Sequence, residues 1–524
     1  MTTVGRSGSL AVATALGLLT AHPPDRLTAQ TIDTIVVQNH NVFDAGTGPG
    51  FVARLANTLH VTTHAGVIRR TLLFDAGDRY DSARVTESER ALRALAIFRQ
   101  VRLDTMRLDG RLAVRVFTAD GWSTKPQTNF SSAGGSVRWE LGMVEQNFLG
   151  TATTLAAVYQ HNPDRTGLDL QYVSPHFFSR RSTLAAEYTG FSDGKWGTWQ
   201  LGRPFYQTSA RWSLTTNGEA ADRRLLLFRD GLHSDTTQRR ALRVGVTAGY
   251  ALYASSRDYV RLWAGAAWRR EDYARDTTSP FPRSTFGAAG AGVELGHARF
   301  TVLEHFNSYA RREDQDLSQV LRLGVWAAPR AWGYAGARAG LGPDLRAQGS
   351  AVWRGGFAVL RASGHGIYSG SGLDSGRVLL ALTVASQSLP RQAWIVHFES
   401  GVAQRAVPGG EFDLWNDQTG PRLFGAHEFT GTHMSWLAVE NRVLVADEVW
   451  GLVGIGLAPF ADWGGAWYAD ERARQGGDVG VALRLGPTRS VRGDVAEIAI
   501  GARFGPANFS GSRWAIAIRK GVEF

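Results

Sequence analysis

Alternating apolar and polar positions dominate the chain from about residue 136 to its end. One stretch carries Val137, Trp139, Leu141 and Met143 at alternate positions. Successive side chains of a strand point to opposite faces, so these four would share one face. The same alternation recurs at 168–172, 242–247, 478–485 and 497–503. One apolar face and one polar or small face, repeated in this way, predicts an all-β transmembrane antiparallel barrel of about 16 strands over residues 136–524.

The last stretch, Arg513 to Phe524, is the strand that we expect to close this barrel. Its apolar face carries Trp514, Ile516, Ile518, Val522 and Phe524. Lys520 interrupts that face and should lie near one end of the span, where a Lys costs roughly 0–1 kcal/mol against 2–4 at the midplane. A strand of a soluble sandwich can alternate in the same way. The aromatic residue at position 524 favours the barrel, because it resembles the C-terminal assembly signature of bacterial outer-membrane barrels.

The connections near the end of the chain fit a barrel whose C-terminus lies in the periplasm. The expected outer loops are 505–512, 470–477 and 407–432, and the expected periplasmic turns are 487–495, 446–448 and 388–392. Barrels have long outer loops and short inner turns, and 487–495 is the one connection that is longer than this rule expects.

Residues 1–30 have the pattern of a secretory signal peptide, with Arg6 followed by an apolar core from Leu10 to Leu19. That core is too short to cross a membrane as a helix. No apolar run of 18 residues occurs elsewhere, so a membrane-embedded chain would cross as strands. The expected localisation is the bacterial outer membrane.

Composition narrows the classes of function. The chain has no cysteine, which excludes disulfides, thiol catalysis and cysteine-based zinc sites and is compatible with the periplasm. The formal net charge of +10 indicates a solvated surface and a polar barrel lumen, or contact with anionic lipid head groups. Nucleic acid is not an expected partner, because no compact basic run is interleaved with aromatic residues.

Residues 31–122 have a different, mixed pattern. Strands are predicted at 32–38, 98–106 and 111–117, the last two around the turn Asp109-Gly110. Helices are predicted at 51–59 and 82–95, and the apolar stretch 68–74 is expected to be extended. The expected order is strand, helix, helix, strand, strand.

Two stretches of this region, VIRRTLLFDAGDRYD and SERALRALAIFRQVRL, resemble the polypeptide-transport-associated (POTRA) domain. The resemblance implies a periplasmic domain that captures an extended client by adding it as a strand to a free sheet edge.

The barrel region resembles the surface-antigen barrel of the BamA/TamA family in MVEQNFLGTATTLA, GPRLFGAHEFTG and PFADWGGAWY. One departure concerns the arginine of the family's outer loop: aligned on Gly425, Phe424 stands in its place. Asp462 matches the wall carboxylate that this arginine meets. Either Arg422 supplies the charge, or Phe424 anchors the loop by packing. In both cases the loop 407–432 is expected to fold into the lumen with its tip near Asp462.

The two resemblances together imply an outer-membrane assembly or translocation factor. Its expected partners are outer-membrane lipid, unfolded or extended client polypeptides and periplasmic accessory proteins, with no cofactor and no metal. The alternatives are a secretion pore for one partner protein, a passive channel, and a barrel enzyme such as a lipase or protease. The enzyme is disfavoured, because no GxSxG, HExxH or Walker loop occurs. The tripeptide Arg492-Gly493-Asp494 is interpreted as chance.

Overall fold

The computed structural model describes residues 30–43, 50–51, 54, 58, 60–133, 135–275, 284–309, 312–336, 338–368, 373–404, 409–414, 419–488, 495–506 and 512–521. The predicted signal peptide up to residue 29, most of the predicted helix at 51–59, the tripeptide at 492–494, Val522 and Phe524 lie outside these residues.

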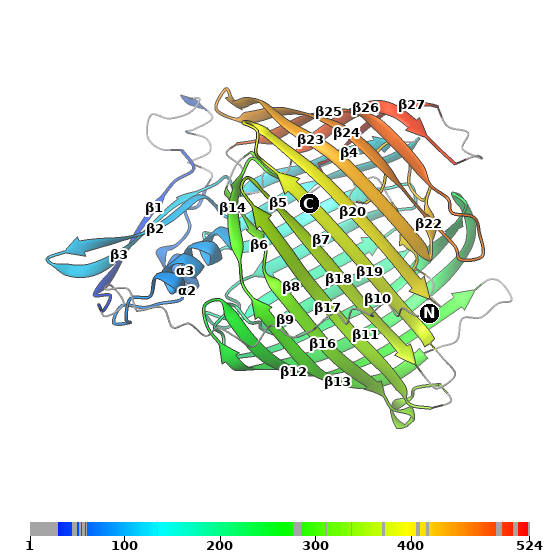
Figure 1. Cartoon of the computed structure of the whole chain (residues 1–524), viewed down its shortest axis with the longest axis horizontal. Helices are drawn as coiled ribbons and strands as arrows, with labels where there is room; N and C mark the ends of the chain where they lie inside the picture. The colour runs from blue at the N-terminus through cyan, green and yellow to red at the C-terminus, as the bar shows by residue number, and fades with distance from the viewer. Residues whose placement is uncertain are drawn as a thin grey trace, which may run out of the picture.

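Twenty strands form one closed antiparallel barrel (Figure 1). They are β4 (Thr124–Ala133), β5 (Ser136–Phe148), β6 (Thr153–His161), β7 (Thr166–Ser174), β8 (Thr183–Phe191), β9 (Gly194–Arg203), β10 (Trp212–Arg229), β11 (Leu232–Ala254), β12 (Asp258–Arg275), β13 (Ser284–His297), β16 (Gln319–Ala328), β17 (Gly340–Trp353), β18 (Gly356–Tyr368), β19 (Leu373–Ser386), β20 (Gln392–Gln404), β23 (His433–Val449), β24 (Val453–Trp467), β25 (Gly476–Pro487), β26 (Ala496–Phe504) and β27 (Trp514–Lys520).

The predicted count of about 16 strands was therefore wrong. The barrel also begins at β4, before the predicted boundary at residue 136. The sequence of β4, TKPQTNFSSA, lacks apolar alternation, which hid this strand. The boundary between β10 and β11 could not be located from sequence either, because residues from Asn217 to Gln238 show little apolar periodicity. The six connections predicted near the end of the chain lie between consecutive barrel strands, except that the turn predicted at 446–448 follows Val449.

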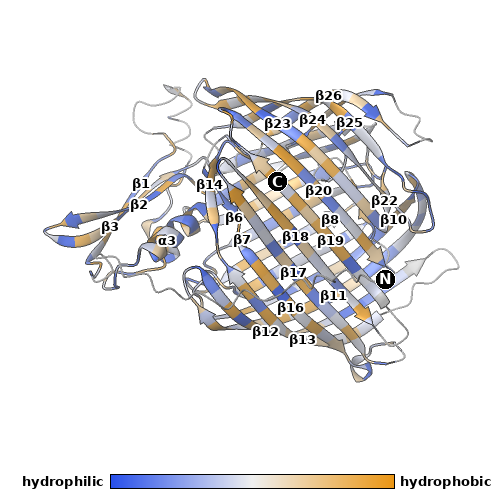
Figure 2. Ribbon diagram, viewed as in Figure 1, coloured by the Kyte–Doolittle hydropathy of each residue, from blue (hydrophilic) through white to orange (hydrophobic). Residues whose placement is uncertain are grey.

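The outer wall of the barrel is apolar and exposed, whereas its inner wall is polar or small. On β25 and β26 the exposed residues Val479, Val481, Ile498 and Ile500 alternate with positions that face the lumen. Figure 2 shows hydrophobic residues recurring at intervals along β17, β18 and β20. An apolar wall around a polar interior is the inverse of a soluble barrel and suits a lipid surrounding.

A small mixed unit lies at one end of the barrel (Figure 1). Its sheet has the order β1-β3-β2, with β1 (Thr34–His40) parallel to β3 (Arg111–Asp120) and β2 (Phe98–Leu108) antiparallel to it. Two helices, α2 (Ala65–Thr71) and α3 (Ser82–Ala94), accompany the sheet. In α3, the Asp81 side chain accepts hydrogen bonds from the backbone N–H groups of Ala83 and Arg84 and so caps the helix.

The stretch 68–74, expected to be extended, begins within helix α2. The buried residues of α2 are Val67, Ile68 and Thr71, at a spacing that brings them to one face of the helix. The apolar character of the stretch favoured an extended interpretation from sequence, but packing against the sheet decides the conformation here. Among the described residues, no helix is long and apolar enough to cross a membrane.

Two smaller sheets complete the fold. The strands β14 (Phe300–Glu304) and β15 (Arg312–Asp316) pair as a hairpin in the connection between β13 and β16. The strands β21 (Phe412–Asp413) and β22 (Thr430–Gly431) pair within the long connection between β20 and β23. A short 3-10 helix, Arg330–Trp332, follows β16.

Buried polar contacts fix the mixed unit against the β5–β6 turn. The Asp120 carboxylate accepts from the Thr63 backbone N–H at 2.7 Å and also bonds His60 Nε2 at 2.8 Å. The Asn147 amide donates to Thr63 Oγ1 at 2.9 Å, and the His64 backbone N–H donates to the Gly150 carbonyl at 3.0 Å. We call the end of the barrel that contacts the mixed unit the domain end, and the opposite end the loop end.

Candidate functional site

The connection between β20 and β23 folds into the lumen from the loop end, and Arg422 is the most buried charged side chain among its described residues. Arg422 is 1 % exposed. Its guanidinium bonds the Asp462 carboxylate through Nε at 2.6 Å and Nη2 at 3.1 Å. Nη1 bonds Glu440 Oε2 at 3.0 Å, and the guanidinium lies 4.1 Å from the centre of the Phe460 ring. A bidentate arginine–carboxylate pair of this kind fixes orientation as well as distance.

Phe424 packs next to Arg422 and does not compete with it. Phe424 is buried with Phe412, Phe429 and Met434 in one apolar cluster of the lumen. Leu423 packs in a second cluster against Phe460 and the small residues of β24 to β27. The two explanations left open by the sequence, charge at Arg422 and packing at Phe424, therefore act on the same loop. Gly425 follows directly and is also buried.

Backbone contacts add to this attachment of the loop. The Leu423 N–H donates to Asp478 Oδ2 at 2.8 Å, and Arg503 Nη1 donates to the Leu423 carbonyl at 3.2 Å. Both partners belong to the barrel wall, Asp478 to β25 and Arg503 to β26. The segment around Arg422 is thus bonded to the wall through both main chain and side chains.

The Arg422 pair belongs to a larger charge network, which we define as Arg422, Asp462, Glu440, Arg442, Arg484, Glu497 and Arg519. Arg442 bonds Glu440 at 2.6 Å, and Arg484 lies 3.3 Å from both Glu440 and Glu497. Arg519 of β27 lies 3.3 Å from Glu497 of β26. All seven side chains are buried. Each buried charge meets an opposite one, which offsets part of the large cost of removing it from water.

The sequence analysis identified two members of the network and missed five. Glu440, Arg442, Arg484, Glu497 and Arg519 lie on the polar faces of neighbouring strands. Sequence periodicity assigns each of them to the lumen, but it gives no register between strands, so it cannot show that they meet. The signal that was available is the concentration of opposite charges on the lumen faces of the last five strands.

The β14–β15 hairpin enters the lumen from the domain end and touches the same network. Arg442 Nη1 donates to the Phe306 carbonyl at 2.6 Å and to Asn307 Oδ1 at 3.0 Å. Phe306 is buried against Phe357, Val359 and Ile395 of the wall. We call residues 299–309 and 312–317 the plug hairpin.

The plug hairpin also contacts the mixed unit. Arg93 of α3 forms a bidentate pair with Asp314, at 2.6 and 2.8 Å. Arg90 stacks over the Phe300 ring at 3.7 Å. A continuous series of contacts therefore runs from helix α3 through the plug hairpin and the charge network to the outer loop.

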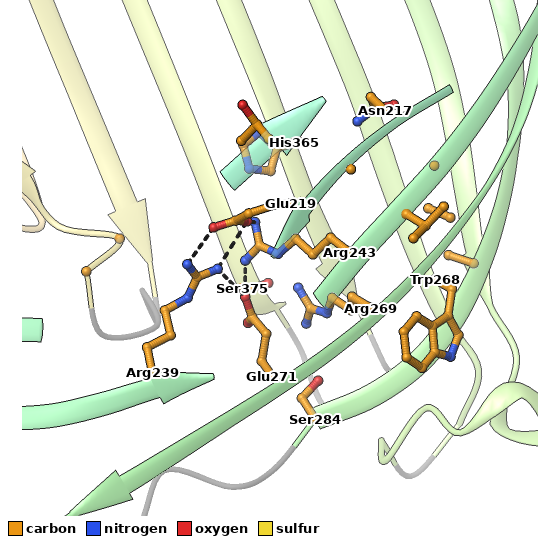
Figure 3. Close-up of a pocket in the computed structure, with 18 of the residues that line it drawn as sticks. Asn217, Glu219, Arg239, Arg243, Trp268, Arg269, Glu271, Ser284, His365 and Ser375 are labelled. Carbon is orange, nitrogen blue, oxygen red and sulfur yellow. Dashed lines mark hydrogen bonds and ion pairs between the residues drawn. The ribbon is translucent and has the colours of Figure 1, made fainter. Parts of the chain in front are cut away.

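A cavity of about 1770 Å³ lies in the lumen and is lined by residues of strands between β6 and β20. Figure 3 shows Arg239 between Glu219 and Glu271, with Arg243 and Arg269 beside them. Arg239 bonds Glu219 at 2.6 Å and Glu271 at 2.9 Å, and Arg243 pairs with Glu271 as well. Within the described residues, no group of His, Asp and Glu has an arrangement that could hold a metal ion.

The closing strand meets the first strand at a weak seam. In the described residues, β27 pairs β4 at one position, Ile518 with Ser132. By contrast, β26 pairs β27 from Ala496 to Ala502, and β4 pairs β5 over its whole length. Trp514 and Ile516 on the outer face of β27 are exposed, as expected for a strand that faces lipid.

One histidine holds the outer loop to a neighbouring turn at the loop end. His427 bonds Asp413 through Nδ1 at 2.6 Å and Asp164 through Nε2 at 3.1 Å. Its ring stacks on Phe228 at 3.7 Å. Burial opposes the charged form, but the hydrogen bonds and charges of Asp164 and Asp413 outweigh it and raise the pKa of His427 to about 9.

Comparisons with known proteins give similarities of structure only. No protein-family model matches the chain, and no curated protein matches it. Solved structures similar to it include BamA from Haemophilus ducreyi lacking POTRA domains 1–3, at TM-score 0.40 and 11% identity, covering 92% of this chain and 84% of that one. CdiB from Escherichia coli has TM-score 0.43 and 10% identity, covering 97% and 91%. CdiB from Acinetobacter baumannii has TM-score 0.41 and 12% identity, covering 94% and 73%. Likenesses of this size carry no argument about function, which has to come from the residues of this chain.

Proposed function

We propose that this protein spans the bacterial outer membrane and assembles or translocates other polypeptides there, with the mixed unit in the periplasm. The observation that carries the proposal is the seam between β27 and β4, which is joined at the Ile518–Ser132 pair among the described residues. The facing edges of these two strands can separate here, and an incoming strand can then pair with their backbone groups.

The mixed unit supports the same proposed function. Strand β2 is at one edge of its sheet, so its outer row of backbone N–H and C=O groups can pair with an extended client, except at the Leu103 N–H, which donates to Glu89. The unit sits at the domain end, next to the β5–β6 turn and hence near the start of the barrel. A client held on this edge is delivered to the seam by diffusion over a short distance, and its own folding supplies the free energy.

The lumen argues against a passive channel in this conformation. The outer loop occupies one end, and the plug hairpin occupies part of the other. A secretion pore for one partner protein remains the second candidate, because both segments could move aside. The lumen cavity of about 1770 Å³ is the observation that favours it.

Cross-linking across the seam separates these functions. The chain has no cysteine, so Ser132→Cys with Ile518→Cys introduces one defined pair. We expect the oxidised variant, in lipid vesicles, to lose insertion of a urea-unfolded eight-stranded barrel protein and to recover it on reduction. The matched control is Ile500→Cys with Ile516→Cys, which joins β26 to β27 where they are already paired.

Each outcome decides between the candidates. Insertion that persists in the oxidised seam variant contradicts the proposal. Persistent export of a client into the vesicle, together with no insertion in any variant, favours the secretion pore. A steady ion conductance in the unmodified protein without a client favours the channel. Heat-modifiable migration on gels, measured first, tests whether the chain forms a detergent-resistant barrel at all.

A further inference from the structure

A group of basic and aromatic side chains lies on one side of the domain end of the barrel, beside the mixed unit. We define the basic-aromatic rim as Phe177, Phe178, Arg180, Arg181, Arg203, Tyr206 and Trp212. These residues come from the β7–β8 turn, the end of β9, the β9–β10 connection and the start of β10. Phe178 is 74 % exposed although it is one of the most apolar residues of the chain.

The rim continues the lipid-facing wall of the barrel. Leu168, Leu170 and Tyr172 share the outer face of β7, and the Phe177 ring lies 6.2 Å from that of Tyr172. Trp212 of β10 is opposite Tyr250 of β11 and both are exposed. Aromatic residues of this kind gather where a barrel wall crosses from the hydrocarbon to the head-group region.

The arginines of the rim hold positive charge that nearby carboxylates do not balance. Arg180 pairs with Asp75 at 2.9 Å. Arg181 donates instead to the Leu72 carbonyl at 2.9 Å and stacks over the Tyr206 ring at 4.4 Å. Arg203 stacks over Trp212 at 4.1 Å and donates to the Tyr206 hydroxyl at 3.2 Å. Within the described part of the chain, neither Arg181 nor Arg203 has a carboxylate partner.

The histidine of the β7–β8 turn agrees with an excess of positive charge. Burial lowers the pKa of His176 in the same turn, and the charges of Arg70, Arg181 and Arg180 lower it further. His176 is therefore neutral at pH 7 and adds no charge of its own. The positive charge of Arg181 and Arg203, which no carboxylate of the described residues pairs with, favours an anionic partner from outside the chain.

We propose that the basic-aromatic rim binds the phosphate head groups of anionic phospholipids, with Phe177 and Phe178 inserted among the acyl chains. This inference rests on the proposed function, because it requires the barrel to lie in a membrane. Guanidinium groups match phosphate in a two-point geometry. The exposed phenylalanines distinguish a lipid from a free phosphate ion, since only a lipid offers an apolar partner next to the charge.

The position of the rim gives the lipid a structural consequence. Arg180 and Arg181 belong to the barrel, yet they bond Asp75 and the carbonyls of Arg69 and Leu72 in the mixed unit. A phospholipid held by these arginines would therefore lie at the joint between barrel and mixed unit. The bound lipid would hold the mixed unit against the membrane surface, with α2 facing the head groups.

Native mass spectrometry of the full chain in detergent tests the inference by titration with phosphatidylglycerol, phosphatidylcholine or inorganic phosphate. We expect phosphatidylglycerol to bind most tightly, and the triple variant Arg180→Gln, Arg181→Gln, Arg203→Gln to weaken it by about tenfold or more. The matched control is Arg102→Gln, Arg107→Gln, Arg111→Gln, which removes the same charge from the β2–β3 hairpin. Phe178→Ser should weaken phosphatidylglycerol binding and leave all rim charges in place.

Equal phosphatidylglycerol binding by the two triple variants would overturn the inference. Binding of inorganic phosphate as tight as that of phosphatidylglycerol, unaffected by Phe178→Ser, would also overturn it, because the rim would then be a free-anion site. Each variant is compared only if it keeps heat-modifiable migration. A heat-modifiable protein that inserts clients but shows no preference for phosphatidylglycerol refutes this inference alone. A wild-type chain that is not heat-modifiable counts against the membrane barrel itself.

Discussion

Arg422 is the side chain whose loss should affect the lumen most. Arg422→Ala leaves Asp462, Glu440 and Glu497 without their shared cation. Breaking a buried pair in this way costs on the order of 3 kcal/mol. We expect a lower urea midpoint and a lower temperature for the heat-modifiable transition. Arg240→Ala is the matched control, because Arg240 is 67% exposed and its pair with Asp222 is 3.5 Å long, so its loss should change little.

The double variant tests whether the effect comes from charge. Adding Asp462→Ala to Arg422→Ala should recover part of the lost stability, since one uncompensated carboxylate is removed. Full recovery is not expected, because Glu440 and Glu497 remain. If Arg422→Ala alone leaves the transition unchanged, the loop is held by the packing of Phe424 and Leu423 instead.

His427 gives the outer loop a pH dependence with a defined sign. Its pKa in the folded chain, about 9, lies above the usual value for an unfolded histidine. Its contribution to stability is therefore complete below about pH 6.5 and is lost as the pH rises through about 9. We expect protease cleavage in the loop to increase between pH 7 and pH 10. His427→Gln should remove this dependence and leave the rest of the barrel resistant.

What could be foreseen at single positions depended on short motifs. The pair of Arg422 and Asp462 was named as one of two alternatives, because the stretches that carry them resemble the loop and wall motifs of one barrel family. The partnership of His427 with Asp164 joins residues far apart in the chain. No periodicity or motif brings these two positions together, because their contact depends on how the outer loop folds over the loop end of the barrel.

The plug hairpin shows how one element can connect separate parts of the molecule. It pairs with α3 through Arg93 and Asp314 and with the charge network through Phe306 and Arg442. Replacing residues 299–317 by a flexible Gly-Ser linker should open the domain end of the lumen. We expect a higher single-channel conductance in planar bilayers, and a further rise when residues 409–431 of the outer loop are shortened as well, since the two segments obstruct the lumen in series.

A point substitution provides the control for that deletion. Arg93→Ala cuts the contact between α3 and the hairpin but leaves Phe306 in the lumen. Conductance should then stay near that of the unmodified protein. An increase as large as that of the deletion would mean that the mixed unit, through Arg93, keeps the hairpin in place. No increase in the deletion variant would show that the hairpin does not obstruct ion flow.

Strands with strong alternation were the elements that sequence could identify. The polar strand β4 and the hairpin β14–β15 were not foreseen. Strand β4 has few apolar residues, and its place in the barrel is decided by its ladder with β5. The hairpin has a charged second strand, Arg312–Asp316, whose sequence REDQD would suit any exposed loop. Pairing with distant partners gave both segments their structure, and that information is not local.

The overall architecture was largely predictable, because a barrel in lipid imposes the same demand on every strand. Most strands present an apolar outer face and pair along both edges, with the polar strand β4 as an exception. This repeated demand gave the fold class from sequence, together with the order of the connections after residue 388. Strand number and lumen contents follow from closure of the whole sheet and from how the loops fold, so neither is encoded in any one segment.

The surroundings of the outer wall can be tested with a single charge. Val481 lies in the middle of β25 on the outer face and is 44% exposed. In lipid vesicles, Val481→Arg should lower the free energy of unfolding by about 2–4 kcal/mol, because an arginine at the midplane of the bilayer loses its hydration. Trp514→Arg, near the end of its span, should cost about 1 kcal/mol or less. Leu108→Arg in the mixed unit is the control and should have little effect, since Leu108 faces water in any setting. Equal small effects of all three would mean that the wall of the barrel does not face lipid, and the proposed location would then be wrong.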